Sequence, residues 1–257
     1  MANDETPTLS FRGFLRAVRL RRDAVESFAG YPFSIPAIRH LERLEFSPGL
    51  TILIGENGVG KSTLAEAIAV KWGFNAEGGS RNFRFETKAT HSVLRDYLVL
   101  ERGVSRPTDG FFLRAESFYA LATEVDRLDA SDPGFVKFFA DRSLHEQSHG
   151  EAFLNLLNHR LLGHGFYIFD EPEAALSPGR QLAVLVLLKR LLAQQSQIIM
   201  ATHSPILMGF PGARIYQLRP EGIAQVEYEE TEHYQITRDF MNSWESYLRH
   251  LFCEEET

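Results

Sequence analysis

GENGVGKST, residues 55–63, lies between an apolar run at residues 50–54 and a segment with helical character at 64–70. The run predicts a buried strand and the following segment a helix. In that context the pattern is typical of a phosphate-binding loop: backbone N–H groups surround phosphate oxygens, Lys61 supplies a cation, and Ser62 offers its hydroxyl to magnesium. The helix N-terminus adds its positive dipole end. We therefore predict a nucleotide phosphate site rather than a simple glycine-rich turn, formed by Gly55, Glu56, Asn57, Gly58, Val59, Gly60, Lys61, Ser62 and Thr63.

Composition restricts the class of protein. The 257 residues are 44% hydrophobic, enough for one large or two small domains, and the formal net charge of −7 argues against a surface coated in positive potential. Five arginines in residues 12–22 form a basic cluster, for which a solvated strand face is favoured over a nucleic-acid surface. The single cysteine, Cys253, excludes an intramolecular disulfide framework. The chain starts without a signal-peptide pattern, and its most apolar run, residues 182–193, is too short to span a bilayer. We expect a cytoplasmic protein.

Two carboxylates follow a second apolar run. Residues 165–169 predict a buried strand that delivers Asp170 and Glu171 to the carboxyl edge of a sheet, where open α/β sheets bind ligands. With a phosphate loop upstream, Asp170 is predicted to hold magnesium together with Ser62. Glu171 is placed to orient and deprotonate a water that attacks the γ-phosphate. Another apolar run, residues 197–202, ends at His203 and is expected to return to the same edge.

Ser148 and Gly150 precede an amphipathic helix and, taken alone, indicate an ordinary N-cap. In order with the other motifs, however, they resemble the ATP-binding-cassette (ABC-type) ATPases. Residues 55–63 resemble the Walker A motif, Ser148-His149-Gly150-Glu151 the signature motif, residues 166–171 the Walker B motif, residues 173–177 the D-loop, and Thr202-His203-Ser204 the switch histidine. Within that class, residues 170–178 and 201–207 are similar to the small AAA_21/AAA_23 group of ATPases, near RecF-like and chromosome-maintenance ATPases.

The resemblance implies an α/β P-loop NTPase fold with a mostly parallel central sheet, an N-terminal antiparallel β part and a helical signature-motif subdomain. Two subunits would sandwich two molecules of ATP with Mg²⁺, each between the Walker A motif of one chain and the signature, Ser148 to Glu151, of the other. Lys61, Glu171 and His203 would be catalytic, and Ser177 would lie at the dimer seam.

Three residues depart from the family pattern. His149 replaces the middle glycine of the signature, Ser177 replaces the usual D-loop aspartate, and Glu116 stands where a Q-loop glutamine is expected. We expect Glu116 to contact water or the metal. For the adenine, the family commonly stacks an aromatic ahead of the Walker lysine, and Tyr31 has that position, although a core role is equally favoured.

We expect residues 1–10 to be disordered, residues 11–236 to form one ATPase domain with a helical insert at about 75–162, and residues 237–257 to form a C-terminal helix and an acidic tail. Thr237 is the expected cap of that helix, which we expect to dock on its own domain, with docking on a partner as the alternative. The predicted function is ATP hydrolysis that drives a conformational switch on a nucleic acid or partner protein. The alternatives are a nucleotide-binding subunit of a membrane transporter, against which the missing Q-loop glutamine argues, and a regulatory ATP switch in a defence or toxin–antitoxin system.

Overall fold

A computed structural model describes residues 11–79, 93–131, 133–140 and 143–252, without the side chain of His149. The predicted N-terminal tail, residues 1–10, and the acidic end, residues 253–257, lie outside the described residues, and so does Cys253.

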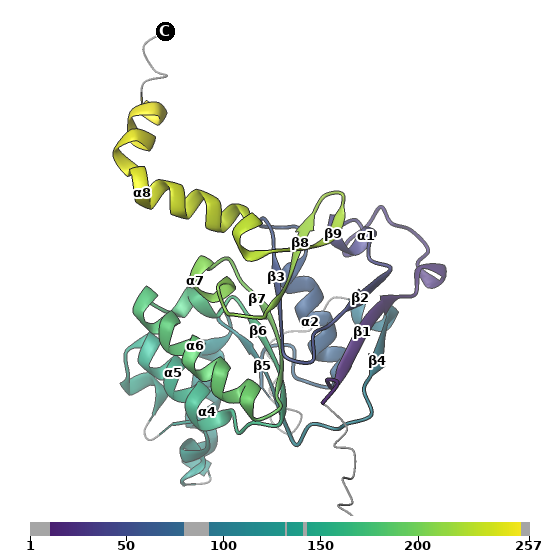
Figure 1. Ribbon diagram of the computed structural model, residues 1–257. Helices are drawn as coiled ribbons and strands as arrows, with labels where there is room; N and C mark the ends of the chain where they lie inside the picture. The colour runs from purple at the N-terminus through teal and green to yellow at the C-terminus, as the bar shows by residue number, and fades with distance from the viewer. Residues whose placement is uncertain (1–10, 80–92, 132, 141–142, 253–257) are drawn as a thin grey trace, which may run out of the picture.

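A six-stranded sheet forms the centre of the molecule (Figure 1). Its order is β5 (Asp109–Arg114), β6 (Gly165–Asp170), β7 (Gln197–Ala201), β3 (Leu50–Ile54), β8 (Arg214–Arg219) and β9 (Gly222–Val226), and only β9 runs antiparallel to its neighbour. Every residue of β3, β6 and β7 is buried, which explains why these strands are continuous apolar runs. Because they are parallel, the residues that follow them meet at one edge of the sheet.

Helices cover both faces of this sheet, and the strands divide their side chains between them. Phe166 and Ile168 of β6 pack with α2 (Lys61–Trp72), while Tyr167 and Phe169 of the same strand pack on the opposite side. That side carries α4 (Phe118–Ser131), α5 (His149–Arg160) and α6 (Pro178–Ala193). The phosphate-loop helix and the helical layer that contains Ser148 therefore lie on opposite faces of the sheet (Figure 1).

The expected N-terminal antiparallel part is a separate three-stranded sheet, ordered β2 (Arg43–Glu45), β1 (Leu15–Leu20), β4 (Leu98–Arg102). The side chain of Gln197 joins it to the central sheet, because its Oε1 accepts from the N–H groups of Phe14 and Leu15, both at 2.8 Å. Arg19 and Arg43 both pair with Glu101, at 3.0 and 2.9 Å, so the basic cluster is partly neutralised at this face.

The remaining elements are short. They are η1 (Arg22–Ala24), α1 (Pro36–Arg39), α3 (Leu94–Tyr97), η2 (Phe135–Phe138), η3 (Leu144–Glu146), η4 (Pro172–Ala175), α7 (Pro205–Met208) and η5 (Tyr228–Glu230). The apolar segment at residues 38–46, which suggests a strand in the sequence, is thus divided between the end of α1 and β2, because Pro36 starts a helical turn.

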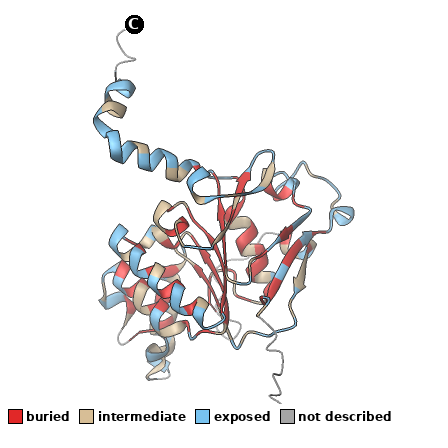
Figure 2. Ribbon diagram, in the orientation of Figure 1, coloured by how far each residue is buried: buried red, intermediate tan, exposed pale blue. Residues whose placement is uncertain are grey.

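The C-terminal helix α8 (Glu232–Phe252) begins earlier than predicted. Its first turn is capped by Thr231, whose Oγ1 accepts from the N–H of Tyr234, and Thr237 lies inside the helix. Contrary to expectation, the helix does not pack along its own domain: none of its residues is buried, and beyond its first turn, where His233 contacts His203, it projects away from the body (Figure 2). No helix of the described residues is both long enough and apolar enough to cross a membrane.

Candidate nucleotide-binding site

The phosphate loop is shaped by glycines that no other residue could replace without strain. Gly55 and Gly60 have φ angles of 142° and 110°, in the region that disfavours side chains. A Cβ atom at Gly55 would lie 2.4 Å from the carbonyl oxygen of Leu218, and one at Gly60 would lie 2.6 Å from Cγ2 of Ile35. The loop is thus held against β8 on one side and Ile35 on the other, and it leads directly into α2 at Lys61.

Lys61 is buried and closes the loop on itself. Its Nζ donates to the carbonyl oxygens of Gly55 and Glu56, at 2.8 and 2.9 Å. Burial lowers the pKa of Lys61, and the charges of Glu171, Asp170 and Glu173 oppose that effect. Charged phosphate oxygens are stronger acceptors than these carbonyls, so the Lys61 ammonium group can donate to a bound nucleotide instead.

Asp170 ends β6 as a buried carboxylate that is incompletely satisfied. Its Oδ1 has no hydrogen-bond partner among the described residues, and its Oδ2 lies 3.5 Å from Nε of Arg114. Burial raises the pKa of Asp170 to about 6, against the charge of Arg114 and the hydroxyl of Ser62. A free carboxylate oxygen beside a hydroxyl is the ligand chemistry of a hard cation, so the residues fit Mg²⁺.

Glu171 follows in a strained backbone conformation. Its φ and ψ are 50° and 51°, a left-handed geometry that is rare outside glycine, and its N–H donates to the carbonyl of Ala201 at 2.9 Å. Strained backbone conformations persist only where the surrounding structure enforces them, and they are frequent at functional sites. The conformation leaves the carboxylate partly exposed, with Oε1 at 3.8 Å from Nε2 of His203.

His203 stands between the Walker B carboxylates and α8. Its backbone N–H donates to Oε1 of Glu173, and its Nδ1 lies 3.3 Å from Nε2 of His233. Its Nε2 is buried without a hydrogen-bond partner within the described parts of the chain. The sheet edge therefore assembles Lys61, Asp170, Glu171 and His203, as predicted from their positions at strand ends.

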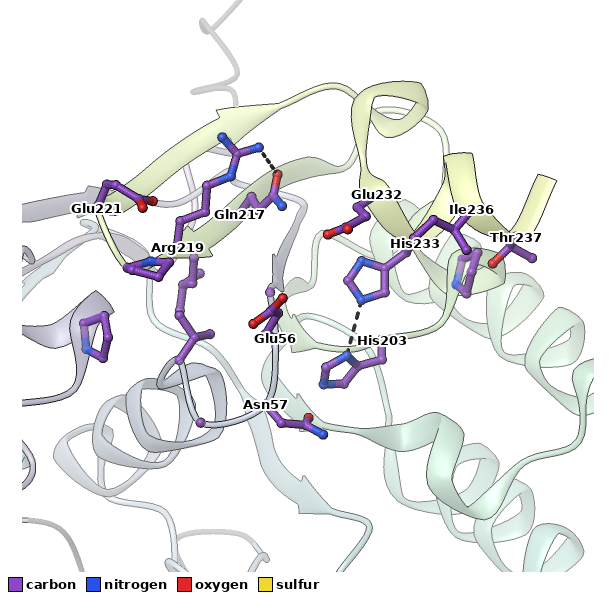
Figure 3. A pocket seen from close by; sticks show the side chains of 17 residues that line it. Glu56, Asn57, His203, Gln217, Arg219, Glu221, Glu232, His233, Ile236 and Thr237 are labelled. Atoms are coloured by element: carbon purple, nitrogen blue, oxygen red, sulfur yellow. Dashed lines mark hydrogen bonds between the residues drawn. The ribbon is translucent and has the colours of Figure 1, made fainter. Parts of the chain in front are cut away.

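A pocket of about 860 Å³ borders the outer side of the phosphate loop. Figure 3 shows Glu56 and Asn57 of the loop on one wall, Arg219 on another, and His203 with His233 facing them. The first half of the phosphate loop, residues 55–59, lines this pocket, whereas Lys61, Asp170 and Glu171 do not.

Two family models match the chain on either side of its middle. A model described as an AAA domain, AAA_23, matches residues 25–99 and includes the phosphate loop. A second AAA-domain model, AAA_21, whose description also names the AbiEii toxin of type IV toxin–antitoxin systems, matches residues 141–209 and spans Ser148 to His203. The phosphate loop between a buried strand and a helix agrees with the first of these matches. The chain is a P-loop NTPase.

Solved structures with a similar fold include the SMC head domain from Thermotoga maritima, at 19% identity and a TM-score of 0.46, covering 83% of this chain and 99% of that one. A nucleotide-free ATP-binding cassette from an ABC transporter gives 16% identity and a TM-score of 0.48, covering 88% of this chain and 95% of that one. A search of curated proteins finds no match.

In this P-loop NTPase, the signature residues form the capped N-terminus of α5. Ser148 Oγ donates to Oε2 of Glu151 at 2.7 Å, and the two residues complete a capping box on α5. Nη2 of Arg180 donates to Ser148 Oγ at 3.3 Å. Gly150 allows close packing, because a Cβ there would lie 2.4 Å from Nη1 of Arg180. The contacts described for Ser148 do not reach the phosphate loop of the same chain.

Three other predicted positions are exposed, and of these only Glu116 is linked to the sheet edge within the described chain, through Arg114. Tyr31 is 70% exposed and does not line the pocket. Ser177 is exposed and precedes α6. Glu116 is exposed and accepts from Nη2 of Arg114 at 3.3 Å. Their roles stay predictions.

Sequence reasoning missed three residues at this site. Arg114 pairs with Glu66 at 2.8 Å as well as facing Asp170, and its place at the end of β5, beside Asp170 in the register, could have revealed it. Glu173 could have been noticed two residues after Glu171. For His233 the sequence has no signal, because its position depends on where α8 begins.

Proposed function

We propose that this chain binds ATP with Mg²⁺ and hydrolyses it, and that two copies close on the nucleotide as a sandwich. The observation that carries the hydrolysis is the convergence at one sheet edge of a buried lysine, a buried carboxylate oxygen that has no partner among the described residues, and a strained glutamate. The lysine can bind phosphate, the carboxylate can bind a metal ion, and the glutamate can act as a base. A purely structural turn would need none of these roles.

Each residue has a role in the reaction. Lys61 exchanges its two carbonyl acceptors for phosphate oxygens and stabilises their charge. Ser62 and Asp170 would hold the magnesium, which neutralises phosphate charge when bound. Glu171 orients a water and accepts its proton as the oxygen bonds to the γ-phosphorus. The bond from that phosphorus to the β–γ bridging oxygen breaks, and ADP leaves. His203 offers Nε2 toward the γ-phosphate.

The sandwich is supported by the position of the signature. Ser148 belongs to the helical layer on the face of the sheet opposite α2, and its described contacts are with Glu151 and Arg180. A second chain would supply Ser148, His149, Gly150 and Glu151 to the nucleotide, with Ser177 at the seam. A helix N-terminus suits an anion, and Ser148 would turn its hydroxyl from Glu151 toward the nucleotide of the second chain.

The effector acted on by such a dimer is a nucleic acid or a partner protein. A regulatory ATP switch in a toxin–antitoxin system is the second candidate, and the AAA_21 match at residues 141–209 favours it over a transporter subunit.

The test is ATP binding and phosphate release by the purified chain, its Lys61→Ala variant and its Glu171→Gln variant. Loss of the Lys61 cation should weaken ATP binding at least about tenfold, since hydrogen bonds to charged groups contribute about 1.5–3 kcal/mol. Glu171→Gln should bind ATP normally and release little phosphate. Lys71→Ala, on the exposed end of α2, is the matched control and should behave as the parent. Unchanged affinity in Lys61→Ala would contradict the proposal.

A further inference from the structure

The first turn of α8 brings a second imidazole to the switch histidine. His233 Nε2 lies 3.3 Å from His203 Nδ1, with ring centroids 5.5 Å apart and planes tilted by 50° (Figure 3). His203 follows β7 at the sheet edge, whereas His233 belongs to a helix outside the sheet. The contact therefore joins the nucleotide site to an element that the motifs of the NTPase do not include.

His233 is held firmly enough to orient its partner. The Thr231 cap fixes the N–H of Tyr234, and the rings of Tyr228 and Tyr234 pack with centroids 4.6 Å apart. Nε2 of Gln235 donates to the carbonyl oxygen of Glu229 at 3.1 Å. These contacts lock the first turn of α8, although the rest of the helix projects into solvent.

The hydrogen bond between the two rings can be made in two ways, and the surroundings favour one. At 3.3 Å one of the two facing nitrogens must carry the proton. If His203 carried it on Nδ1, its Nε2 would present a lone pair to the Glu171 carboxylate, whose Oε1 is 3.8 Å away. If His203 carries it on Nε2, that N–H faces the carboxylate and Nδ1 accepts from His233. The second arrangement avoids the electrostatic repulsion.

Both rings are in environments that favour the neutral form. Burial lowers the pKa of His203, and Lys61 lowers it further, against Glu171. Burial likewise lowers the pKa of His233, with His203 adding to the effect. Nδ1 of His233 is buried without a partner in the described chain, as expected for a neutral ring that donates through Nε2. Two neutral imidazoles make one defined hydrogen bond.

We propose that His233 is a positioning residue: its Nε2–H donates to Nδ1 of His203 and so keeps the His203 proton on Nε2, the nitrogen that faces the nucleotide site. This inference rests on the proposed function for its consequence, because a γ-phosphate needs a donor at that place. It extends the catalytic machinery from the sheet edge to the base of α8.

The direct test is the tautomer of His203 in the full chain without nucleotide, read from two-bond ¹⁵N–¹H correlations and assigned with His203→Gln. The parent protein should show the Nε2–H tautomer. His233→Phe should show a shift toward a mixture, while His250→Phe, the same change at an exposed histidine of α8, should leave the spectrum of His203 unchanged. The proposal would be overturned if the His203 proton stayed on Nε2 in His233→Phe, or if it lay on Nδ1 in the parent.

Turnover gives a second readout. Loss of an orienting hydrogen bond commonly costs about tenfold in rate, so His233→Phe should lower kcat about tenfold with little change in KM. His233→Gln, whose amide can still donate to Nδ1, should recover most of that loss. Equal losses in both variants would contradict a donor role. If His233→Phe shows the predicted tautomer shift but the parent hydrolyses no ATP, the positioning role stands and the proposed function fails.

Discussion

Glu171 combines a strained backbone conformation with the position of the proposed catalytic base. Its left-handed backbone, with φ at 50°, costs about 1–3 kcal/mol for a residue other than glycine. Glu171→Gly removes this strain but adds about 0.5–1 kcal/mol of backbone entropy cost, so it should raise the free energy of unfolding by up to about 2 kcal/mol while abolishing hydrolysis. Glu171→Gln, which retains the strained backbone, should lose hydrolysis without any gain in the free energy of unfolding. Denaturant titration of both variants checks this, and a less stable Glu171→Gly would show that the conformation carries no strain.

Asp109 lies at the other end of β5 and has a structural role. It accepts from Nη1 of Arg160 at 2.7 Å and from the hydroxyl of Tyr167 at 2.8 Å. Burial acts to raise the pKa of Asp109, but Arg160, Tyr167 and the N–H of Leu162 lower it overall. Asp109→Asn leaves the partly buried Arg160 without its counter-charge and should cost about 3 kcal/mol at pH 7.

The pH dependence of that loss has a defined sign. A carboxyl whose pKa is depressed in the folded state contributes stability above its unfolded pKa, about 3.9 for Asp, and loses it as pH falls through the folded pKa. The difference between parent and Asp109→Asn should thus be constant above about pH 5 and shrink below pH 4. Unfolding titrations across this range measure it, and a difference that grows on acidification would contradict the assignment.

Among the elements, the phosphate loop depends on Gly60 more than its motif alone suggests. A side chain there would adopt φ near 110° and meet Ile35. Gly60→Ala should cost about 1–3 kcal/mol of stability and weaken ATP binding. Gly179→Ala is the control, because a Cβ atom at Gly179 meets nothing within 4 Å. The two variants are compared by thermal unfolding and nucleotide titration, and equal stabilities would exclude the steric argument.

Helix α8 should contribute little to the stability of the body. Trp244 is 52% exposed and no residue of α8 is buried, so Trp244→Gln should change the free energy of unfolding by less than about 0.5 kcal/mol. Leu156→Ala, at a fully buried position of α5, should cost about 3 kcal/mol. A large loss in the tryptophan variant would mean that α8 packs on the body after all.

These elements also show what sequence can predict. The strands that deliver Asp170 and His203 are apolar runs buried on both faces. Such a run involves only consecutive residues and can therefore be recognised in the sequence. The site at their ends follows from parallel pairing. The exposure of α8 could not be predicted, because its amphipathic spacing fits a covered helix and an exposed one equally. The contact of His233 with His203 depends on where the first turn of α8 lies and was missed for the same reason.

At the scale of the chain as a whole, the phosphate loop and the signature lie in different layers, α2 on one face of the central sheet and α5 on the other (Figure 1). The order of the motifs in the sequence predicts both parts, and the fold confirms an α/β sheet with a separate antiparallel part. That a second copy of the chain completes the ATP site with its signature residues stays a prediction.

The solution mass of Glu171→Gln, with and without ATP and Mg²⁺, tests that prediction most directly. Slow hydrolysis should let the closed form accumulate, so light scattering should show the mass of one chain without nucleotide and of two chains with it. Ser148→Arg introduced into the same variant should bind ATP and keep the mass of one chain. A single-chain mass for Glu171→Gln at saturating ATP would contradict the sandwich.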